Sequence, residues 1–199
     1  MRIFGTNLSD NLTGTEGADL MIGLGREDTI RGGDGGDEIR GQLGNDFLVG
    51  DLGGDRLFGH RGADRIYGGE GHDLLDGGTG HDALFGESGN DTLRGGRGND
   101  QLVGGPGHDL LFGGSGQDSF QITPLTRGSV TEIMDFRDGR DSVVFAGWGD
   151  LALEDLEAYA RQKDVDGDGS SDVVLRYQGQ TLVVHDTTVA ALEDDVVFT

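Results

Sequence analysis

The chain has 199 residues, of which 34 % are hydrophobic against the ~45–50 % usual in globular domains, and 40 are glycine. Its formal net charge of −22 comes mainly from aspartate, since 28 of the 37 acidic residues are Asp. This composition argues against a conventional large core for the whole chain, disfavours nucleic acid and anionic membranes as partners, and favours cations.

The chain contains no cysteine, so it can form neither disulfides nor thiolate metal sites. Residues 1–12 lack the apolar core of a signal peptide, and no run approaches the ~18 apolar residues of a membrane span. We therefore expect a soluble protein without a membrane span. If the protein is exported, we expect a route other than the usual N-terminal one.

A nine-residue repeat starts at Gly5 and continues without insertion to Gln121, which gives thirteen units. Position 1 is Gly and position 6 is Asp in every unit, and position 8 is always Leu, Met, Ile or Phe. Position 4 is Gly in eleven units, the exceptions being Leu8 and Arg26. Such a period is typical of solenoids, whose stacked repeats bury a core that no single repeat could bury.

Each unit predicts a tight turn followed by a short strand. Glycine in positions 1 to 5 gives access to positive φ, and positions 7 to 9 can form a strand in which only position 8 points inward. Two units then make one coil of eighteen residues. For residues 1–121 we predict an all-β fold, a parallel β-roll in which two narrow sheets enclose a thin apolar seam.

The repeat stops after Gln121, and residues 122–199 predict a small α+β region that caps the open end of the roll. Its predicted elements are strands at 131–136 and 141–147, an amphipathic helix at 153–163, and strands at 172–177 and 181–186. The last two strands would be joined by a hairpin turn at Gln178-Gly179.

The aspartates at position 6 suggest metal binding, because a turn alone could use Asn, Ser or Gly in some of the units. Units two apart stack on the same side of the roll at about the ~4.8 Å strand spacing. Asp73, Asp91 and Asp109 would therefore share one row, and Asp82, Asp100 and Asp118 the opposite row. Like charges at this spacing repel, and a cation between turns would reverse the sign of the interaction.

Calcium suits such sites best, since it takes about 6–8 oxygen ligands in a tolerant geometry, which carboxylates and glycine carbonyls can supply. Magnesium prefers stricter geometry and its own waters, and zinc or copper would prefer His or Cys. The alternative interpretation is a glycine-rich solenoid with solvated aspartates and no metal. The predicted carboxylate ligands are Asp19, Asp37, Asp46, Asp55, Asp64, Asp73, Asp82, Asp91, Asp100, Asp109 and Asp118.

The glycines predicted to turn carbonyls toward the ions are Gly35, Gly53, Gly62, Gly69, Gly71, Gly78, Gly80, Gly89, Gly96, Gly98, Gly105, Gly107, Gly114 and Gly116. Asp10 and Asp28 are weaker candidates, because Leu8 and Arg26 replace the position-4 glycine of their units. Seven units on one side and six on the other leave at most eleven gaps. Nine to eleven calcium ions would supply a charge of +18 to +22 against the chain's −22.

The repeat closely resembles the RTX, or hemolysin-type, calcium-binding nonapeptide GGxGxDxUx over residues 5–121. This resemblance implies a right-handed parallel β-roll with calcium between its turns, in a protein that folds outside a bacterial cell, where calcium is plentiful. The segment IMDFRDGRDSVVF resembles those that close such arrays. The final LEDDVVFT is similar to the C-termini of proteins that use the type I secretion machinery, although an ordinary terminal strand would look the same.

Other polar groups are weaker candidates. Asp164, Asp166, Asp168 and Asp172 follow the spacing of a calcium loop of the EF-hand type, but Leu175 stands where the bidentate Glu should be. These residues form either an irregular calcium loop or a solvated acidic turn. His60, His72, His81 and His108 fall in turns, where they would fill polar positions; a chance transition-metal site between His72 and His108 is the alternative. We find no catalytic signature and expect no enzymatic activity.

One outward-facing stripe is apolar and stacked at eighteen-residue intervals. Its members are Phe47, Val49, Tyr67, Phe85 and Val103. The stripe either reflects strand propensity on a half-exposed sheet, or is covered by the C-terminal region or by a second copy.

The function that these features predict is a calcium-binding module that folds on binding several ions. Low hydrophobicity and high net charge favour disorder without calcium, so binding free energy would become folding free energy. The alternatives are an accessory, non-catalytic module of a secreted enzyme of the metalloprotease, lipase or alginate epimerase type, and an extracellular interaction module.

Overall fold

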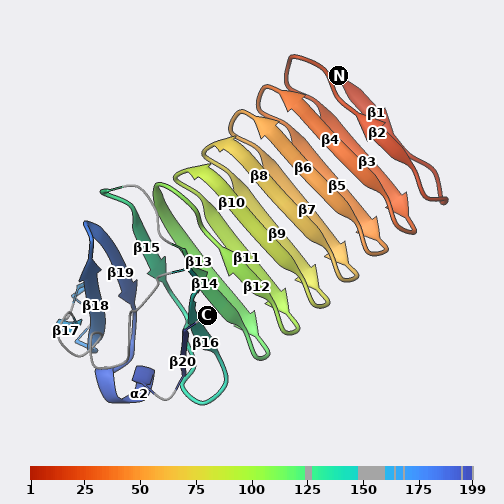
Figure 1. The fold of residues 1–199 in the computed structure, drawn as a ribbon. Coiled ribbons are helices and arrows are strands. Elements are labelled where there is room, and N and C mark those ends of the chain that lie inside the picture. Colours follow the sequence, from red (N-terminus) through yellow and green to blue (C-terminus); the bar gives the residue numbers. More distant parts are fainter. Residues whose placement is uncertain (124–126, 148–159, 164, 168, 194, 199) are drawn as a thin grey trace.

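The computed structural model describes residues 1–123, 127–147, 160–163, 165–167, 169–193 and 195–198. The chain winds into a flattened roll of two sheets whose repeat strands are all parallel, with the N-terminal strands at one end and the C-terminal strands at the other (Figure 1). Sheet A contains, in spatial order, β1 (Arg2–Phe4), β3 (Leu20–Gly25), β5 (Glu38–Leu43), β7 (Arg56–Arg61), β9 (Leu74–Thr79), β11 (Thr92–Arg97), β13 (His108–Ser115), β15 (Val130–Ile133), β19 (Gln180–Val184), β18 (Asp172–Tyr177) and β17 (Ala160–Lys163). Sheet B contains β2 (Asn11–Thr13), β4 (Thr29–Asp34), β6 (Phe47–Leu52), β8 (Arg65–Gly71), β10 (Ala83–Gly89), β12 (Gln101–Val103), β14 (Ser119–Ile122), β16 (Ser142–Phe145) and β20 (Val196–Phe198).

The register confirms that one coil contains two units. Met21 pairs with Ile39 and Ile39 with Leu57, always eighteen residues further along the chain and always in parallel. Every position-8 side chain from Met21 to Phe120 is fully buried, so the predicted apolar seam is the core of the roll. Most strands run for six residues rather than three, because positions 1 to 3 of the next unit continue the ladder.

The residues after the repeat extend both sheets. β15 pairs with β13 and β16 with β14, both in parallel, and β20 then adds to β16. The predicted hairpin between β18 and β19 is confirmed, with positive φ at both Gln178 and Gly179. A short helix, α2 (Val189–Glu193), precedes β20. The apolar core is continuous from the roll into these strands and includes Ile133, Val143 and Leu182.

The predicted helix at 153–163 is wrong for its last four residues. Ala160–Lys163 form strand β17, which pairs antiparallel with β18, whereas residues 153–159 lie outside the described part of the chain. Pairing with β18 satisfies main-chain groups of β17 across the sheet, and such tertiary pairing overrides a weak helical preference.

Candidate metal centre

The position-6 aspartates form a ladder along each side of the roll. In each step, the main-chain N–H of one Asp donates to Oδ1 of the Asp one coil later, as Asp46 does to Asp64 at 2.7 Å. Eleven such bonds of 2.7–3.1 Å join Asp10 through Asp118 in two rows. The ladder fixes each side chain in one orientation and uses one of its two carboxylate oxygens.

The second carboxylate oxygen, Oδ2, is buried without a hydrogen-bond partner in eleven of these aspartates. They are Asp28, Asp37, Asp46, Asp55, Asp64, Asp73, Asp82, Asp91, Asp100, Asp109 and Asp118. All of them are at most 3 % exposed. A buried, unpaired carboxylate oxygen costs several kcal/mol, so eleven of them in one small protein require a common partner.

The position-1 glycines make room for these oxygens. A Cβ built on Gly68 would lie 2.5 Å from Asp73 Oδ2 and 2.7 Å from the carbonyl oxygen of Gly86, which occupies position 1 one coil later. Any side chain here would collide with both oxygens. The invariance of position 1 therefore reflects the space between a carboxylate and a carbonyl, and these carbonyls are possible ligands that the sequence alone did not suggest.

Positions 2 and 4 of each turn from the third unit onward have positive φ. All fourteen glycines predicted to present carbonyls adopt this conformation, and so do Gly33 and Gly44, which the prediction omitted. Residues other than glycine adopt it too: Leu24, Arg26, Gln42, Asp51, His60 and Glu87, with φ between 68° and 85°. The main-chain carbonyl oxygen of His60, at position 2, occupies the space that a Cβ on Gly78 in the next coil would need, and the carbonyl oxygen of Gly62, at position 4, does the same for Gly80.

Burial disfavours the charged form of the ladder carboxylates. Desolvation is the main effect that raises the pKa of Asp64, Asp91 and Asp100 to about 7, and the charges of neighbouring aspartates raise it further. The hydrogen bond from the N–H of the preceding Asp in the row acts in the opposite direction and lowers the pKa. The pKa of other members of the rows rises to about 6 for the same main reason; these are Asp46, Asp55, Asp82 and Asp109. Without a cation, the charged roll is therefore electrostatically unfavourable.

The donor set matches calcium. Each gap offers a carboxylate Oδ2 and several main-chain carbonyls, which are the hard oxygen ligands that Ca²⁺ prefers in a tolerant geometry. In the part of the chain that the structure describes, no three His, Asp or Glu side chains converge as a ready metal cluster. An ion between coils would therefore draw most of its ligands from the main chain.

Comparison with known proteins agrees with this geometry. The profile of the RTX calcium-binding nonapeptide repeat matches four times, over residues 4–25, 22–57, 49–84 and 85–120. The chain belongs to the RTX calcium-binding repeat family. A search of curated protein sequences gave no match.

Two solved structures were found to be similar to this RTX chain. The extracellular lipase LipA from Serratia marcescens is 20 % identical with a TM-score of 0.51, over 98 % of this chain and 40 % of the lipase. The AlgE6R3 subunit of the Azotobacter vinelandii mannuronan C5-epimerase is 20 % identical with a TM-score of 0.26, over 97 % of this chain and 82 % of that one. The chain thus spans less than half of the lipase's length. None of the helices in the described residues has the length and apolar character needed to cross a membrane.

The first two RTX turns are built differently. The main-chain N–H and Oγ1 of Thr6 both donate to Asp10 Oδ2, and those of Thr15 donate to Asp19 Oδ2 in the same way. The terminal ammonium of Met1 pairs with Asp19 Oδ1 at 2.5 Å, where a preceding Asp N–H would otherwise donate. This contact is the main cause of the lowered pKa of Asp19. In these two turns, protein donors therefore satisfy the oxygens that remain unpaired in later turns.

The far end of one RTX row is closed by residues that the repeat pattern did not reveal. Asp118 N–H donates to Asp141 Oδ1 at 3.0 Å, so Asp141 continues the ladder after a spacing of 23 residues. The Arg137 guanidinium lies 3.7 Å from Asp118 Oδ2 and 3.8 Å from Asp141 Oδ2. A positive side chain thus faces the last carboxylates of this row. The signal available in the sequence was the acidic GRD segment before a short strand.

Position 5 carries a second ladder outside the RTX carboxylates. His72 Nδ1 accepts a bond from Asn90 N–H, and Asn90 Oδ1 accepts one from His108 N–H, both at 2.9 Å. On the other side, the equivalent bonds join His81, Asn99 and Gln117. The rings of His72 and His81 therefore accept bonds from main-chain donors of the turns, as the polar interpretation predicted, whereas the ring of His108 pairs with Glu132.

The acidic loop after β17 is only partly described, because Asp164 and Asp168 lie outside the described residues. Asp172 is fully buried, and its carboxylate accepts bonds from Val165 N–H at 2.6 Å and Asp186 N–H at 3.1 Å. Asp166 is exposed, and its carboxylate lies 3.8 Å from His185 Nδ1. Protein donors thus already occupy Asp172, the buried one of the two carboxylates that the structure describes here.

Proposed function

We propose that this chain is a calcium-binding RTX module that folds when Ca²⁺ ions enter the gaps between its coils, after secretion. The observation that carries the proposal is the set of eleven buried Oδ2 atoms without a hydrogen-bond partner, seven of which lie beside a main-chain carbonyl oxygen of the next coil. The last of them, Asp118 Oδ2, also lies 3.7 Å from the Arg137 guanidinium. The ligands would be the position-6 carboxylates and the carbonyls of positions 1, 2 and 4. Bound calcium would supply positive charge to carboxylates that the protein itself leaves unpaired, and binding free energy would become folding free energy.

The turn geometry predicts nine ions rather than eleven. Both left-handed positions occur only from the third unit onward, which leaves six complete turns in one row and five in the other. Six stacked turns enclose five gaps and five enclose four, so nine gaps have a complete turn on each side. Asp10 and Asp19 belong to the turns that threonine closes, so we do not expect them to hold an ion through Oδ2.

A calcium titration tests this proposal. We expect circular dichroism to show a steep transition from coil to β structure as calcium replaces a chelator, because neighbouring coils share ligands. Native mass spectrometry of the folded form should give nine bound ions. Identical spectra in chelator and in calcium would refute calcium-dependent folding. Eleven ions would show that the threonine-closed turns also bind calcium.

The pH dependence provides a further expectation. The folded pKa of Asp64 is about 7 against 3.8 when unperturbed, so the metal-free roll binds more protons than the unfolded chain between these values. Its stability should therefore fall as pH rises from about 4 to 7. Circular dichroism in chelator at pH 5.5 and pH 7.5 checks this. We expect more β structure at pH 5.5, and equal spectra at the two pH values would contradict the expectation.

A second candidate is that the module accompanies a secreted enzyme. The likeness to a secreted lipase over 40 % of that lipase's length favours this candidate. The module itself would be non-catalytic, and the C-terminal segment around β20 would address the type I secretion machinery. An immunoblot of the producing culture tests this: an accessory module predicts a secreted band well above 21.0 kDa. A band at that mass would favour the isolated module.

A further inference from the structure

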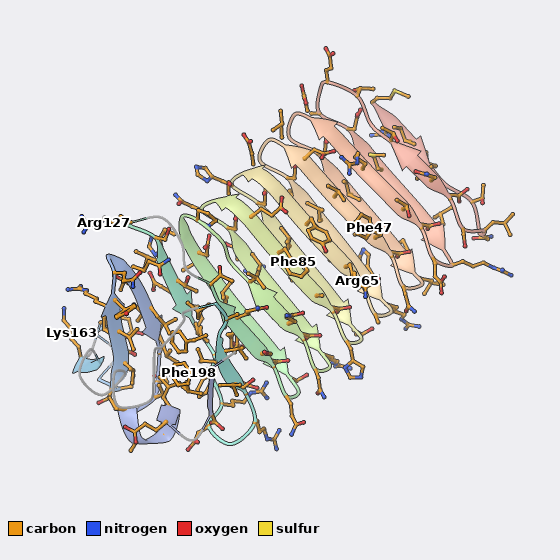
Figure 2. The ribbon with its side chains drawn as sticks, in the orientation of Figure 1. Phe47, Arg65, Phe85, Arg127, Lys163 and Phe198 are labelled. Atoms are coloured by element: carbon orange, nitrogen blue, oxygen red, sulfur yellow. The ribbon has the colours of Figure 1, made fainter. Side chains whose placement is uncertain are left out.

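The apolar stripe of Phe47, Val49, Tyr67, Phe85 and Val103 lies on the outer face of sheet B. Tyr67 and Phe85 stack with centroids 4.7 Å apart, and Phe47 lies 5.4 Å from Tyr67. Phe47 and Phe85 point out along the side of the roll, while the described C-terminal strands extend the sheets at its end (Figure 2). The described residues of the C-terminal region therefore do not cover the stripe.

Carboxylates flank this stripe along one margin. Asp34 and Glu70 occupy position 3 of units two coils apart, and both are exposed. Together with Asp51 and Glu87 they line a shallow depression of about 340 Å³ beside Val49. Asp51 already pairs with Arg31 at 2.9 Å, which is an exposed pair of small energetic value. This side of sheet B thus has an apolar column from Val49 to Phe85 and an acidic edge, and it also carries the exposed side chains of Arg31, beside Val49, and Arg65, beside Phe47.

The outer face of sheet A has the opposite charge. Arg61 and Arg97 also occupy position 3 of units two coils apart, and both are exposed. They line a groove of about 580 Å³ with His60, and its lining includes Gly78 and Gly96, which leave it open. Arg94 lies over the Phe112 ring at 5.5 Å on the same face. The net charge of the chain is −22, and these arginines give the groove a local charge of the opposite sign.

We propose that the acidic, apolar face of sheet B in one copy docks on the arginine groove of sheet A in a second copy. Asp34 and Glu70 would then face Arg61 and Arg97 of that copy. The distance between the two carboxylates equals that between the two arginines, because the members of each pair occupy the same repeat position and lie two coils apart. This alignment shifts one copy by one and a half coils, so about five coils overlap. At ~4.8 Å per coil and with six-residue strands, the contact measures roughly 24 by 20 Å, which is smaller than the ~800 Å² per partner of a standard interface and suits a weak association.

The stripe does not offer the flat aromatic platform that a sugar ring would need. Tyr67 and Phe85 stack nearly parallel on each other, at 10°, along the column of coils, so each ring covers the face of the other. Side chains of an opposing sheet, with arginines that pair the flanking carboxylates, match this surface better. Because two different faces meet, the contact does not close on itself, and we expect a concentration-dependent series of oligomers.

This inference rests on the proposed function. Nine calcium ions would supply +18 and reduce the net charge from −22 to −4, which removes most of the repulsion between copies. Association should therefore require calcium both for the fold and for the charge. It should also weaken at high salt, because the contact depends on exposed charges.

Sedimentation velocity in calcium, with circular dichroism on the same samples, tests the proposal. We expect the wild-type chain to associate at low salt, and the pairs Arg61→Glu/Arg97→Glu and Asp34→Arg/Glu70→Arg each to weaken association at least tenfold. Mixing the two variants should restore it, because each then offers the face that the other lacks. Arg127→Glu/Arg176→Glu, with the same charge change in the C-terminal region, is the control and should associate as wild type.

The outcomes separate the two proposals. A chain that stays unfolded in calcium contradicts the proposed function. A chain that folds in calcium but remains monomeric at all concentrations overturns only the docking proposal. Association that survives both charge reversals, or that mixing fails to restore, would also overturn it, and would point to the stripe binding its own copy or another partner.

Discussion

Replacing Asp64 by asparagine is expected to stabilise the chain in chelator and to destabilise it in calcium. Asparagine keeps the Oδ1 that accepts the bond from Asp46 N–H, so the ladder remains intact. It removes a buried charge whose pKa burial raises to about 7, which relieves the metal-free roll. In calcium it removes a charged ligand, and we expect that site to lose at least tenfold in affinity, or about 1.4 kcal/mol.

Urea denaturation in calcium measures the loss of stability, and circular dichroism in chelator measures whether the variant contains more β structure than the wild-type chain. Asp10→Asn is the matched control, because Asp10 has the same repeat position but its Oδ2 accepts bonds from Thr6. We expect little change in ion number for the control and one fewer ion for Asp64→Asn by native mass spectrometry. A solenoid with solvated aspartates and no metal would be unaffected or stabilised under both conditions, so a stabilised variant in calcium would contradict the calcium site.

Replacing Gly71 by alanine is expected to cost about 3 kcal/mol or more in calcium. Gly71 has φ of 152°, which an L side chain adopts only with strain, and a Cβ there would overlap the carbonyl oxygen of Gly53 in the preceding coil. That carbonyl lies in a gap predicted to hold an ion. The substitution should therefore separate two coils and remove the ion between them, because the clash can be relieved only by moving main chain.

Gly54→Ala is the matched control for this substitution. Gly54 occupies position 5 of the unit one coil earlier and does not have positive φ. A Cβ there would lie 3.4 Å from the nearest atom, the carbonyl oxygen of His72. Alanine already stands at this position as Ala63. Thermal unfolding in calcium should show a change within about 1 kcal/mol for Gly54→Ala. Equal melting temperatures for the two variants would show that the position-4 conformation is not required.

The sequence was sufficient for the architecture of the repeats. A period of nine with one apolar position per unit leaves no other way to bury that residue than stacked coils, and the parallel register of Met21, Ile39 and Leu57 follows from it. Invariant Asp at position 6 also indicated carboxylate rows. These features lie within single units and recur in all thirteen of them, so the sequence alone was enough to predict them.

The ends of the rows depended on tertiary structure. Leu8 and Arg26 suggested that the turns of the first and third units were weak, yet Arg26 adopts the left-handed conformation while the second unit, with Gly17 at position 4, does not. Thr15 determines the turn conformation of the second unit, because its hydroxyl and its main-chain N–H both donate to Asp19 Oδ2. A hydroxyl at position 2 reaches the Asp only in the folded turn. The repeat pattern alone therefore could not show that Thr at position 2 affects a turn more than the loss of Gly at position 4.

The C-terminal region shows the same division. The hairpin at Gln178-Gly179 was predictable because its turn residues and flanking apolar runs are adjacent in the sequence. Asp141 and Arg137 were not, because they join the carboxylate row only when β16 pairs with β14. By itself, the sequence determined the coil, its core and the row of carboxylates, since each follows from residues within one repeat. Only the tertiary structure decided which oxygens remain unpaired, because that depends on which donors from outside the repeat reach the ends of each row.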